Sequence, residues 1–127
     1  MTSKKELGEY GEQLAANYYS DAGYIVLEKN YRFGHDEIDL IVRNDVSVAF
    51  VEVKTRTGEP GAFGRPSAAV NRHKRLCLLR GAAAYMRTHK TGLRHRFDVV
   101  EINVNEYDYT YSINVIKNAF DSKGYIT

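Results

Sequence analysis

The chain has 127 residues, with 43% hydrophobic and 27% charged residues, a net charge of +2 and one cysteine. This composition is typical of one globular domain with a real core, and it excludes a disulfide framework and a cysteine-only zinc site. The polar start does not resemble a signal peptide, and no apolar run approaches the roughly 20 residues that cross a bilayer. We therefore expect a cytoplasmic protein, in which Cys77 is a small buried thiol.

The first predicted element is a helix over residues 3–22. Ser3 followed by Glu6 gives the pattern of a capping box, and Gly23 ends the helical periodicity. Helical spacing groups Gly8, Gly11, Ala15 and Tyr19 into a face of mostly small residues, suited to close packing on a sheet.

Three strands are predicted next, at about 24–31, 36–43 and 47–55. Gly34 marks a turn between the first two strands. Asn44 and Asp45 predict a hairpin turn between the second and third.

The second half begins with a loop, TGEPGAFGRP, which is followed by a helix at about 67–89. We expect one apolar stripe on this helix, formed by Leu76, Leu79, Ala83 and Met86. Strands are predicted at 96–104 and 109–117, and we interpret the alternating Tyr107, Tyr109 and Tyr111 as strand core rather than a base-stacking platform. The order αβββαββ indicates one α/β domain, 1–127, with a mixed five-stranded sheet flanked by helices.

Basic residues concentrate in an acid-free stretch. No Asp or Glu lies between Glu59 and Asp98, whereas this stretch holds half of the chain's 18 Lys and Arg residues. Clustered Lys and Arg neutralise phosphates and release counterions, which favours a nucleic-acid partner. The same pattern also fits a solvated helix face whose charges balance in the folded protein.

The predicted hairpin carries acids within apolar runs. If its turn has an even length and is centred just after Asn44, Glu37 lies directly opposite Glu52. Asp39 then lies opposite Phe50 and diagonal to Glu52, close enough for the two carboxylates to share one ion.

Side-chain alternation separates the hairpin into two faces. The charged face holds Glu37, Asp39, Glu52 and Lys54, and the apolar face holds Ile38, Leu40, Val42, Val51 and Val53. Opposed carboxylates destabilise a sheet unless they are neutralised, and one lysine offsets only one of three negative charges. A divalent cation such as Mg²⁺, which prefers oxygen ligands, would offset the rest. The alternative is a solvent-exposed face with ordinary surface charges.

Glu12 is expected at the rim of the small-residue face of the first helix. From there its carboxylate can reach the charged face of the hairpin. The alternative is a Glu on the helix surface.

A helix-borne Glu, an Asp on one strand and Glu-x-Lys on the next resemble the PD-(D/E)XK nuclease superfamily. The matching residues are Glu12, Asp39, Glu52 and Lys54, although Ile38 stands where the superfamily's namesake has proline. More narrowly, the chain resembles the bacterial YraN-like family. That likeness is carried by GEYGEQLAANYY, NYR, EIDLIVR, VAFVEVKTR, the AAV stretch before Lys74, and RFDVV, which together span residues 8–100.

The resemblance implies a restriction-endonuclease-like fold, similar to archaeal Holliday-junction resolvases. It also implies a metal-dependent endonuclease that acts on branched or structured DNA, and resolvases of this kind work as symmetric homodimers. Asp39, Glu52 and Glu12 would hold Mg²⁺ or Mn²⁺, and Lys54 would orient the attacking water or stabilise developing negative charge. Glu37 is either a further partner of this site or a surface charge.

Phosphate contacts are expected from the basic residues nearest the site, with Lys74 ranked first because it matches the family's pattern. These residues are Arg32, Arg56, Arg72, Lys74 and Arg75. Such contacts position a nucleic-acid backbone without reading bases, which favours recognition of DNA shape. Two other functions stay open: a non-catalytic nucleic-acid-binding module on the same fold, and a nuclease that acts on RNA.

Overall fold

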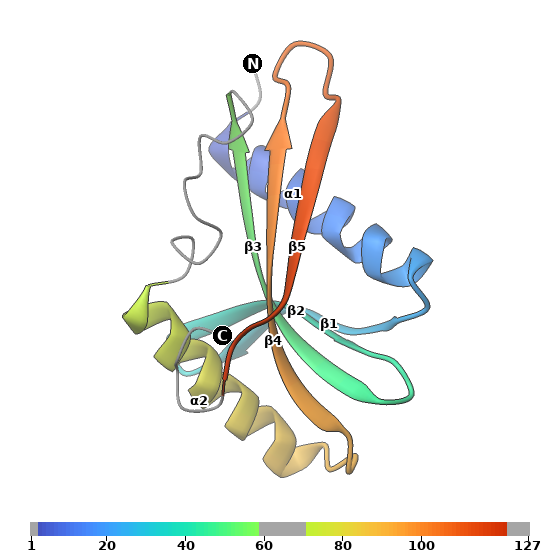
Figure 1. The fold of residues 1–127 in the computed structure, drawn as a ribbon. Helices are drawn as coiled ribbons and strands as arrows, with labels where there is room; N and C mark the ends of the chain where they lie inside the picture. The colour runs from blue at the N-terminus through green and yellow to red at the C-terminus, as the bar shows by residue number, and fades with distance from the viewer. Residues whose placement is uncertain (1–2, 59–70, 122–127) are drawn as a thin grey trace.

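The computed structural model describes residues 3–58 and 71–121 as a mixed five-stranded sheet with two helices (Figure 1). The elements are α1 (Lys4–Asp21), β1 (Ile25–Phe33), β2 (Asp36–Arg43), β3 (Ser47–Thr57), α2 (Arg72–Thr88), β4 (Arg94–Val104) and β5 (Tyr111–Phe120). The order αβββαββ confirms the predicted single-domain α/β class. Most of the predicted glycine-rich loop and the predicted helix start at 67 lie outside the described residues.

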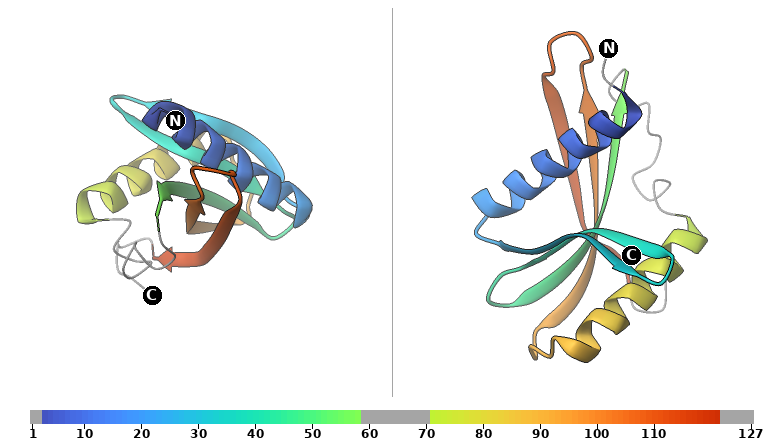
Figure 2. Two further views of the ribbon diagram at one scale, coloured as in Figure 1. Left: turned by 90° about the horizontal axis from the view of Figure 1, so that it is seen from above. Right: turned by 180° about the vertical axis from the view of Figure 1, so that it is seen from behind.

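The strands lie in the sheet in their sequence order, β1 to β5. β3 and β4 are parallel, and α2 lies between them in the chain, whereas the other neighbouring strands are antiparallel. α1 packs on one side of the sheet and α2 on the other (Figure 2). Each helix therefore covers its own apolar core, and the sheet separates the two.

α1 begins and ends where the sequence predicts. The Ser3 hydroxyl accepts a 3.1 Å hydrogen bond from the main-chain N–H of Glu6, and Gly23 follows the helix with a positive φ of 91°. Gly11 is buried, and a Cβ at this position would collide with the side chain of Thr55 on β3. The glycine therefore lets α1 approach the sheet closely, as the small-residue face predicts.

The predicted hairpin register is wrong by one residue at the turn. Leu40 pairs with Val51 and Arg43 with Val48, so the turn is centred after Asp45 rather than after Asn44. The cause is the Asn44 side chain, whose Oδ1 accepts hydrogen bonds from the main-chain N–H groups of Val46 at 2.9 Å and Ser47 at 2.8 Å. This Asx-turn makes Asn44 the first residue of the turn. The turn still has an even number of residues, so the β3 side chains that were predicted to share a face do share it.

Two further expectations about core residues are wrong in part or in full. Of the predicted α2 stripe, Leu79 and Met86 are partly buried against the core but Leu76 and Ala83 are exposed. The buried positions of the helix are Cys77, Leu78, Gly81, Ala82 and Tyr85. The helix is thus rotated by about one position relative to the predicted stripe. Tyr107, Tyr109 and Tyr111 are exposed rather than core: the first two lie in the turn between β4 and β5, and Tyr111 is the first residue of β5. Cys77 is a buried free thiol, as predicted.

A buried ion pair within β4 is hydrogen-bonded to α1. Asp98 is fully buried and accepts hydrogen bonds from Arg96 Nε at 2.9 Å and Nη2 at 3.0 Å. Its Oδ2 also accepts a 2.7 Å hydrogen bond from the Tyr19 hydroxyl of α1. The buried charge is therefore compensated, as stability requires. Within residues 3–58 and 71–121, neither helix is long and apolar enough to span a membrane.

Candidate active site

β1 and β2 both change direction at one position, where Asn30 faces Asp39. The register places these residues between the pairs Lys29–Leu40 and Tyr31–Ile38. Asn30 has a left-handed φ of 51°, which Asn tolerates better than most residues. The alternation of side chains breaks here, because Leu40 packs in the α1 core but Ile38 in the α2 core. The prediction that Ile38 shares the apolar face of Leu40 is therefore wrong.

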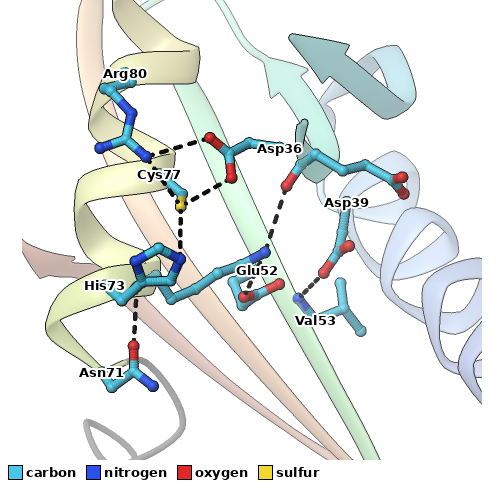
Figure 3. Close-up of polar contacts among 10 residues, drawn as sticks. Asp36, Asp39, Glu52, Val53, Asn71, His73, Cys77 and Arg80 are labelled. Carbon is cyan, nitrogen blue, oxygen red and sulfur yellow. Dashed lines mark hydrogen bonds and ion pairs between the residues drawn. The ribbon is translucent and has the colours of Figure 1, made fainter. Parts of the chain in front are cut away.

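At this bend β2 also parts from β3, and Asp39 bridges the two strands. The last pair of the β2–β3 ladder is Leu40 with Val51. Beyond it, Asp39 Oδ2 accepts a 2.8 Å hydrogen bond from the main-chain N–H of Val53 (Figure 3). The carboxylate thus replaces a main-chain acceptor and is held beside Glu52. The expected pairs Asp39–Phe50 and Glu37–Glu52 do not form, because Phe50 pairs with Ile41 and the β2–β3 ladder ends at Leu40.

Glu52 is only 3% exposed and lies on the α2 side of β3. Burial raises the pKa of its carboxyl, and the hydrogen-bonded, negatively charged Asp39 raises it further, while Lys74 and Lys54 oppose the shift. The Lys74 ammonium lies 3.3 Å from Glu52 Oε2 and 3.4 Å from the main-chain oxygen of Glu37. Within the described chain, Glu52 Oε2 nevertheless lacks a hydrogen bond with acceptable geometry. The site therefore concentrates negative charge that two lysines only partly offset.

Glu12 reaches this cluster from α1, as the sequence predicts. With its amide nitrogen turned toward the acids, Asn30 donates to Glu12 Oε1 at 3.2 Å and to Glu37 Oε1 at 2.7 Å. Burial and then the charge of Asp39 raise the pKa of Glu12 to about 7, although the Asn30 hydrogen bond lowers it. Glu37 also forms an ion pair with Arg32 at 3.5 Å. Glu37 is therefore a neighbour of Glu12 rather than an isolated surface charge.

Lys54 follows Glu52 by two residues on β3 and is half-buried. Its charge lowers the pKa of Glu52, so the two side chains interact across the same face. The structure thus brings together the four residues Glu12, Asp39, Glu52 and Lys54 and adds Lys74.

The other predicted phosphate contacts lie around this cluster. Arg56 is exposed on β3, two residues beyond Lys54, and Arg72 is exposed in the first turn of α2. Arg75 is half-buried, and Arg32 points outward from β1 while it pairs with Glu37. Arg56 lies two residues from Lys54 on β3, and Arg72 and Arg75 lie within two residues of Lys74 on α2. Arg32 contacts the cluster through Glu37.

Comparison with known proteins identifies the family. The model of the uncharacterised protein family UPF0102 matches residues 11–102. The chain belongs to this family. A UPF0102 protein of Clostridium botulinum strain 657 is 40% identical over 118 residues, which cover 91% of the chain and 94% of that relative. UPF0102 proteins of Clostridium kluyveri and Alkaliphilus oremlandii are each 42% identical over 91% of the chain, covering 94% and 98% of those relatives. Membership agrees with the YraN-like resemblance of the sequence.

The donor atoms of this UPF0102 chain fit a hard divalent cation. Asp39 and Glu52 present adjacent carboxylates, and within the described residues the buried Glu52 Oε2 has the Lys74 ammonium at 3.3 Å but no hydrogen bond of acceptable geometry. Within the described ranges, no three His, Cys, Asp or Glu side chains already converge tightly enough to form a metal centre. Mg²⁺ and Mn²⁺ take one or two carboxylates and complete their coordination with water and phosphate oxygens, so two adjacent acids are enough protein ligands for either ion.

Two features of the UPF0102 site were missed by the sequence analysis. Asn30 carries a recognisable signal, because Asn is depleted in strand interiors and there marks an irregular backbone. A second cluster at the start of β2 joins Asp36 to Cys77 Sγ at 3.1 Å and to Arg80 Nη2 at 3.2 Å (Figure 3). No local pattern indicates this cluster, since it depends on how α2 lies across β2.

Proposed function

We propose that this UPF0102 protein is a metal-dependent endonuclease that hydrolyses phosphodiester bonds in branched or structured DNA. The observation that supports this most strongly is the Asp39–Glu52 carboxylate pair. The two acids lie adjacent at one bend, and Glu52 is only 3% exposed. The Lys74 ammonium, 3.3 Å from Glu52 Oε2, offsets only part of their charge, and a divalent cation between the carboxylates would offset the rest.

The proposed ligands are Asp39 and Glu52, and Glu12, whose pKa is raised by the charge of Asp39, would contribute through water. When bound, Mg²⁺ or Mn²⁺ would lower the pKa of a water molecule and neutralise charge on the phosphate. Lys54 would stabilise the negative charge that develops on the reacting phosphate. Glu12, with a pKa of about 7, can accept or release a proton near neutral pH. Lys74 holds Glu52 in place through its 3.3 Å ion pair.

The proposed substrate follows from the surrounding charge and the family resemblance. Arg56, on the strand that carries Glu52, and Arg72, in the first turn of α2, are exposed and would contact phosphates next to the reacting one. Backbone contacts of this kind do not read base sequence, so DNA shape would select the substrate. Similarity to Holliday-junction resolvases favours branched DNA in the cytoplasm, and cutting two strands of one junction would require a homodimer.

The test compares wild type, Asp39→Asn and Glu52→Gln on a labelled four-way junction, a plain duplex and a structured RNA. Each substrate is incubated with Mg²⁺, with Mn²⁺ and with EDTA. Asp36→Asn is the matched control, because Asp36 lies on the same strand but contacts Cys77 and Arg80 instead of Glu52.

We expect metal-dependent cutting of the junction by wild type and the control, with at least a hundredfold loss in the two site variants. Cutting of RNA alone would assign the protein to RNA. Binding of nucleic acid without cutting in any metal would refute the nuclease and identify a binding module.

A further inference from the structure

The α2 side of β3–β5 carries a polar surface that continues beyond the carboxylate cluster. Lys54 pairs with Glu101 of β4, and Arg56 pairs with Asn103. In Figure 1, α1 lies behind this half of the three strands, and α2 packs on the other half of the sheet. A strand of nucleic acid at Glu52 and Lys54 could therefore extend along β3 toward the turn between β4 and β5.

A pocket of about 350 Å³ opens at the end of this surface. Its lining residues are Gly58, Asn103, Asn105, Glu106, Tyr107, Thr110 and Ser112. Asn103 is the register partner of Arg56, so the pocket begins roughly 7 Å beyond Lys54 along the strand. This volume is within the range of small-ligand sites.

The pocket and its approach offer hydrogen-bond acceptors that lack donors. Among described residues, Asn103 Oδ1 and Glu101 Oε2 are buried without a hydrogen-bond partner, and Glu101 is only 5% exposed. Glu106 adds another carboxylate to the lining. The Thr110 hydroxyl already donates to Asp108 at 2.7 Å. A phosphate would be repelled here, whereas a group with N–H donors would satisfy these acceptors.

We propose that this pocket binds an unpaired nucleobase that carries an exocyclic amino group, on a nucleotide next to the cut phosphate. This rests on the proposed nuclease function and names a feature of its substrate. Asn103 lines the pocket while its Oδ1 is buried, so a rotation of this side chain would let the amino group of cytosine or adenine donate to Oδ1. Asn makes such a contact with adenine, and acidic side chains make it with cytosine. Tyr107 is 89% exposed at the rim and provides a ring for stacking. A base paired in a duplex cannot enter without unstacking, so the pocket favours DNA with unpaired nucleotides.

The test measures binding of the full chain in EDTA, where metal-dependent cutting is prevented. The probes are fluorescent branched duplexes with one unpaired nucleotide at the branch, either deoxycytidine or deoxyuridine. Cytosine carries an amino group where uracil carries a carbonyl oxygen, so a difference in affinity between the two probes reports on the proposed contact. We expect wild type to bind the deoxycytidine probe about tenfold more tightly.

Three variants complete the test. Asn103→Leu is expected to remove the preference while its melting temperature reports on folding. Tyr107→Ala is expected to weaken binding of both probes. Tyr111→Ala is the matched control, because Tyr111 faces the α1 side and lines a separate groove with Leu14 and Tyr18. It is expected to bind both probes as wild type does.

The base-binding proposal is refuted if wild type binds the two probes equally, or if folded Asn103→Leu keeps the preference for deoxycytidine. Failure to bind either probe overturns it as well. Metal-dependent cutting with no base preference would refute the base-binding proposal but support the nuclease function. A cytosine preference without cutting in any metal would support base binding but refute the nuclease function.

Discussion

Asp39 accepts a 2.8 Å hydrogen bond from the main-chain N–H of Val53 while its carboxylate lies beside Glu52. One side chain therefore completes the β2–β3 junction and also supplies half of the proposed cation site. The two roles make different demands, because the junction needs an oxygen acceptor whereas the cation needs a negative charge.

This difference predicts opposite effects of two substitutions on stability without metal. Asp39→Asn keeps an oxygen for Val53 and removes the repulsion with Glu52, so it should be at least as stable as wild type. Asp39→Ala leaves the Val53 N–H unpaired and should lower the free energy of unfolding by about 1–3 kcal/mol. Urea denaturation in EDTA measures both. Equal destabilisation by the two variants would show that the hydrogen bond is not what Asp39 contributes.

The pH dependence of stability should reveal Glu12. Its pKa rises from 4.5 to about 7 on folding because of burial and the neighbouring acids. A carboxyl with a raised pKa stabilises the fold fully below pH 4.5, and this contribution is lost as pH rises through about 7. The free energy of unfolding in EDTA should therefore fall across this range, and Glu12→Gln should flatten the fall. Glu9→Gln, an exposed residue of the same helix, should change the profile much less.

Metal binding should have the opposite dependence on pH. Carboxylates must lose their protons to bind a cation, and the raised pKa values of Glu52 and Glu12 mean that binding releases protons. Added Mn²⁺ should therefore raise the melting temperature more at pH 8 than at pH 6. Glu52→Gln should abolish this increase, while Glu106→Gln, a carboxylate near the β4–β5 turn, should retain it. An increase that is the same at both pH values would place the ion elsewhere.

The charged face was predictable from sequence although the register was not. An even-length turn preserves which residues of β3 share a face, so the shift caused by Asn44 left Glu52 and Lys54 together. The bend at Asn30 was not predictable in this way. It depends on one left-handed residue and on the contact of its amide with acids from two elements.

The remaining features depend on specific side-chain contacts, and these could not be predicted. Lys74 was expected to contact phosphate, and the sequence did not indicate that α2 also brings its ammonium to Glu52. The tyrosines after β4 alternate like a strand, yet Asn105 Oδ1 accepts the main-chain N–H of Tyr107 and forms a turn there. Both outcomes depend on contacts that periodicity does not encode.

Lys74 and Arg72 should therefore behave differently, although both are basic residues at the start of α2. Lys74→Met leaves Glu52 without its nearest cation, so the pKa of Glu52 should rise further and metal binding should require a higher pH. Arg72→Met should leave metal binding unchanged and reduce the salt dependence of DNA binding by about one phosphate contact. Thermal shifts with Mn²⁺ and a salt titration of DNA affinity separate the two effects. Similar profiles for both variants would mean that Lys74 acts only as a phosphate contact.

Asn30 offers a test of how the acids are held. Asn30→Gly keeps the left-handed backbone at φ 51° but removes the amide between Glu12 and Glu37. Loss of that hydrogen bond should raise the pKa of Glu12 above about 7, because the bond lowers it in the wild type. Asn30→Ala loses the same amide and also strains the backbone, so it should be less stable than the Gly variant by about 1 kcal/mol. Carboxyl-carbon NMR titration of Glu12 measures the first effect and urea denaturation the second. An unchanged Glu12 pKa in a folded Gly variant would show that the amide does not bind the acid, and that Asn30 serves only the bend.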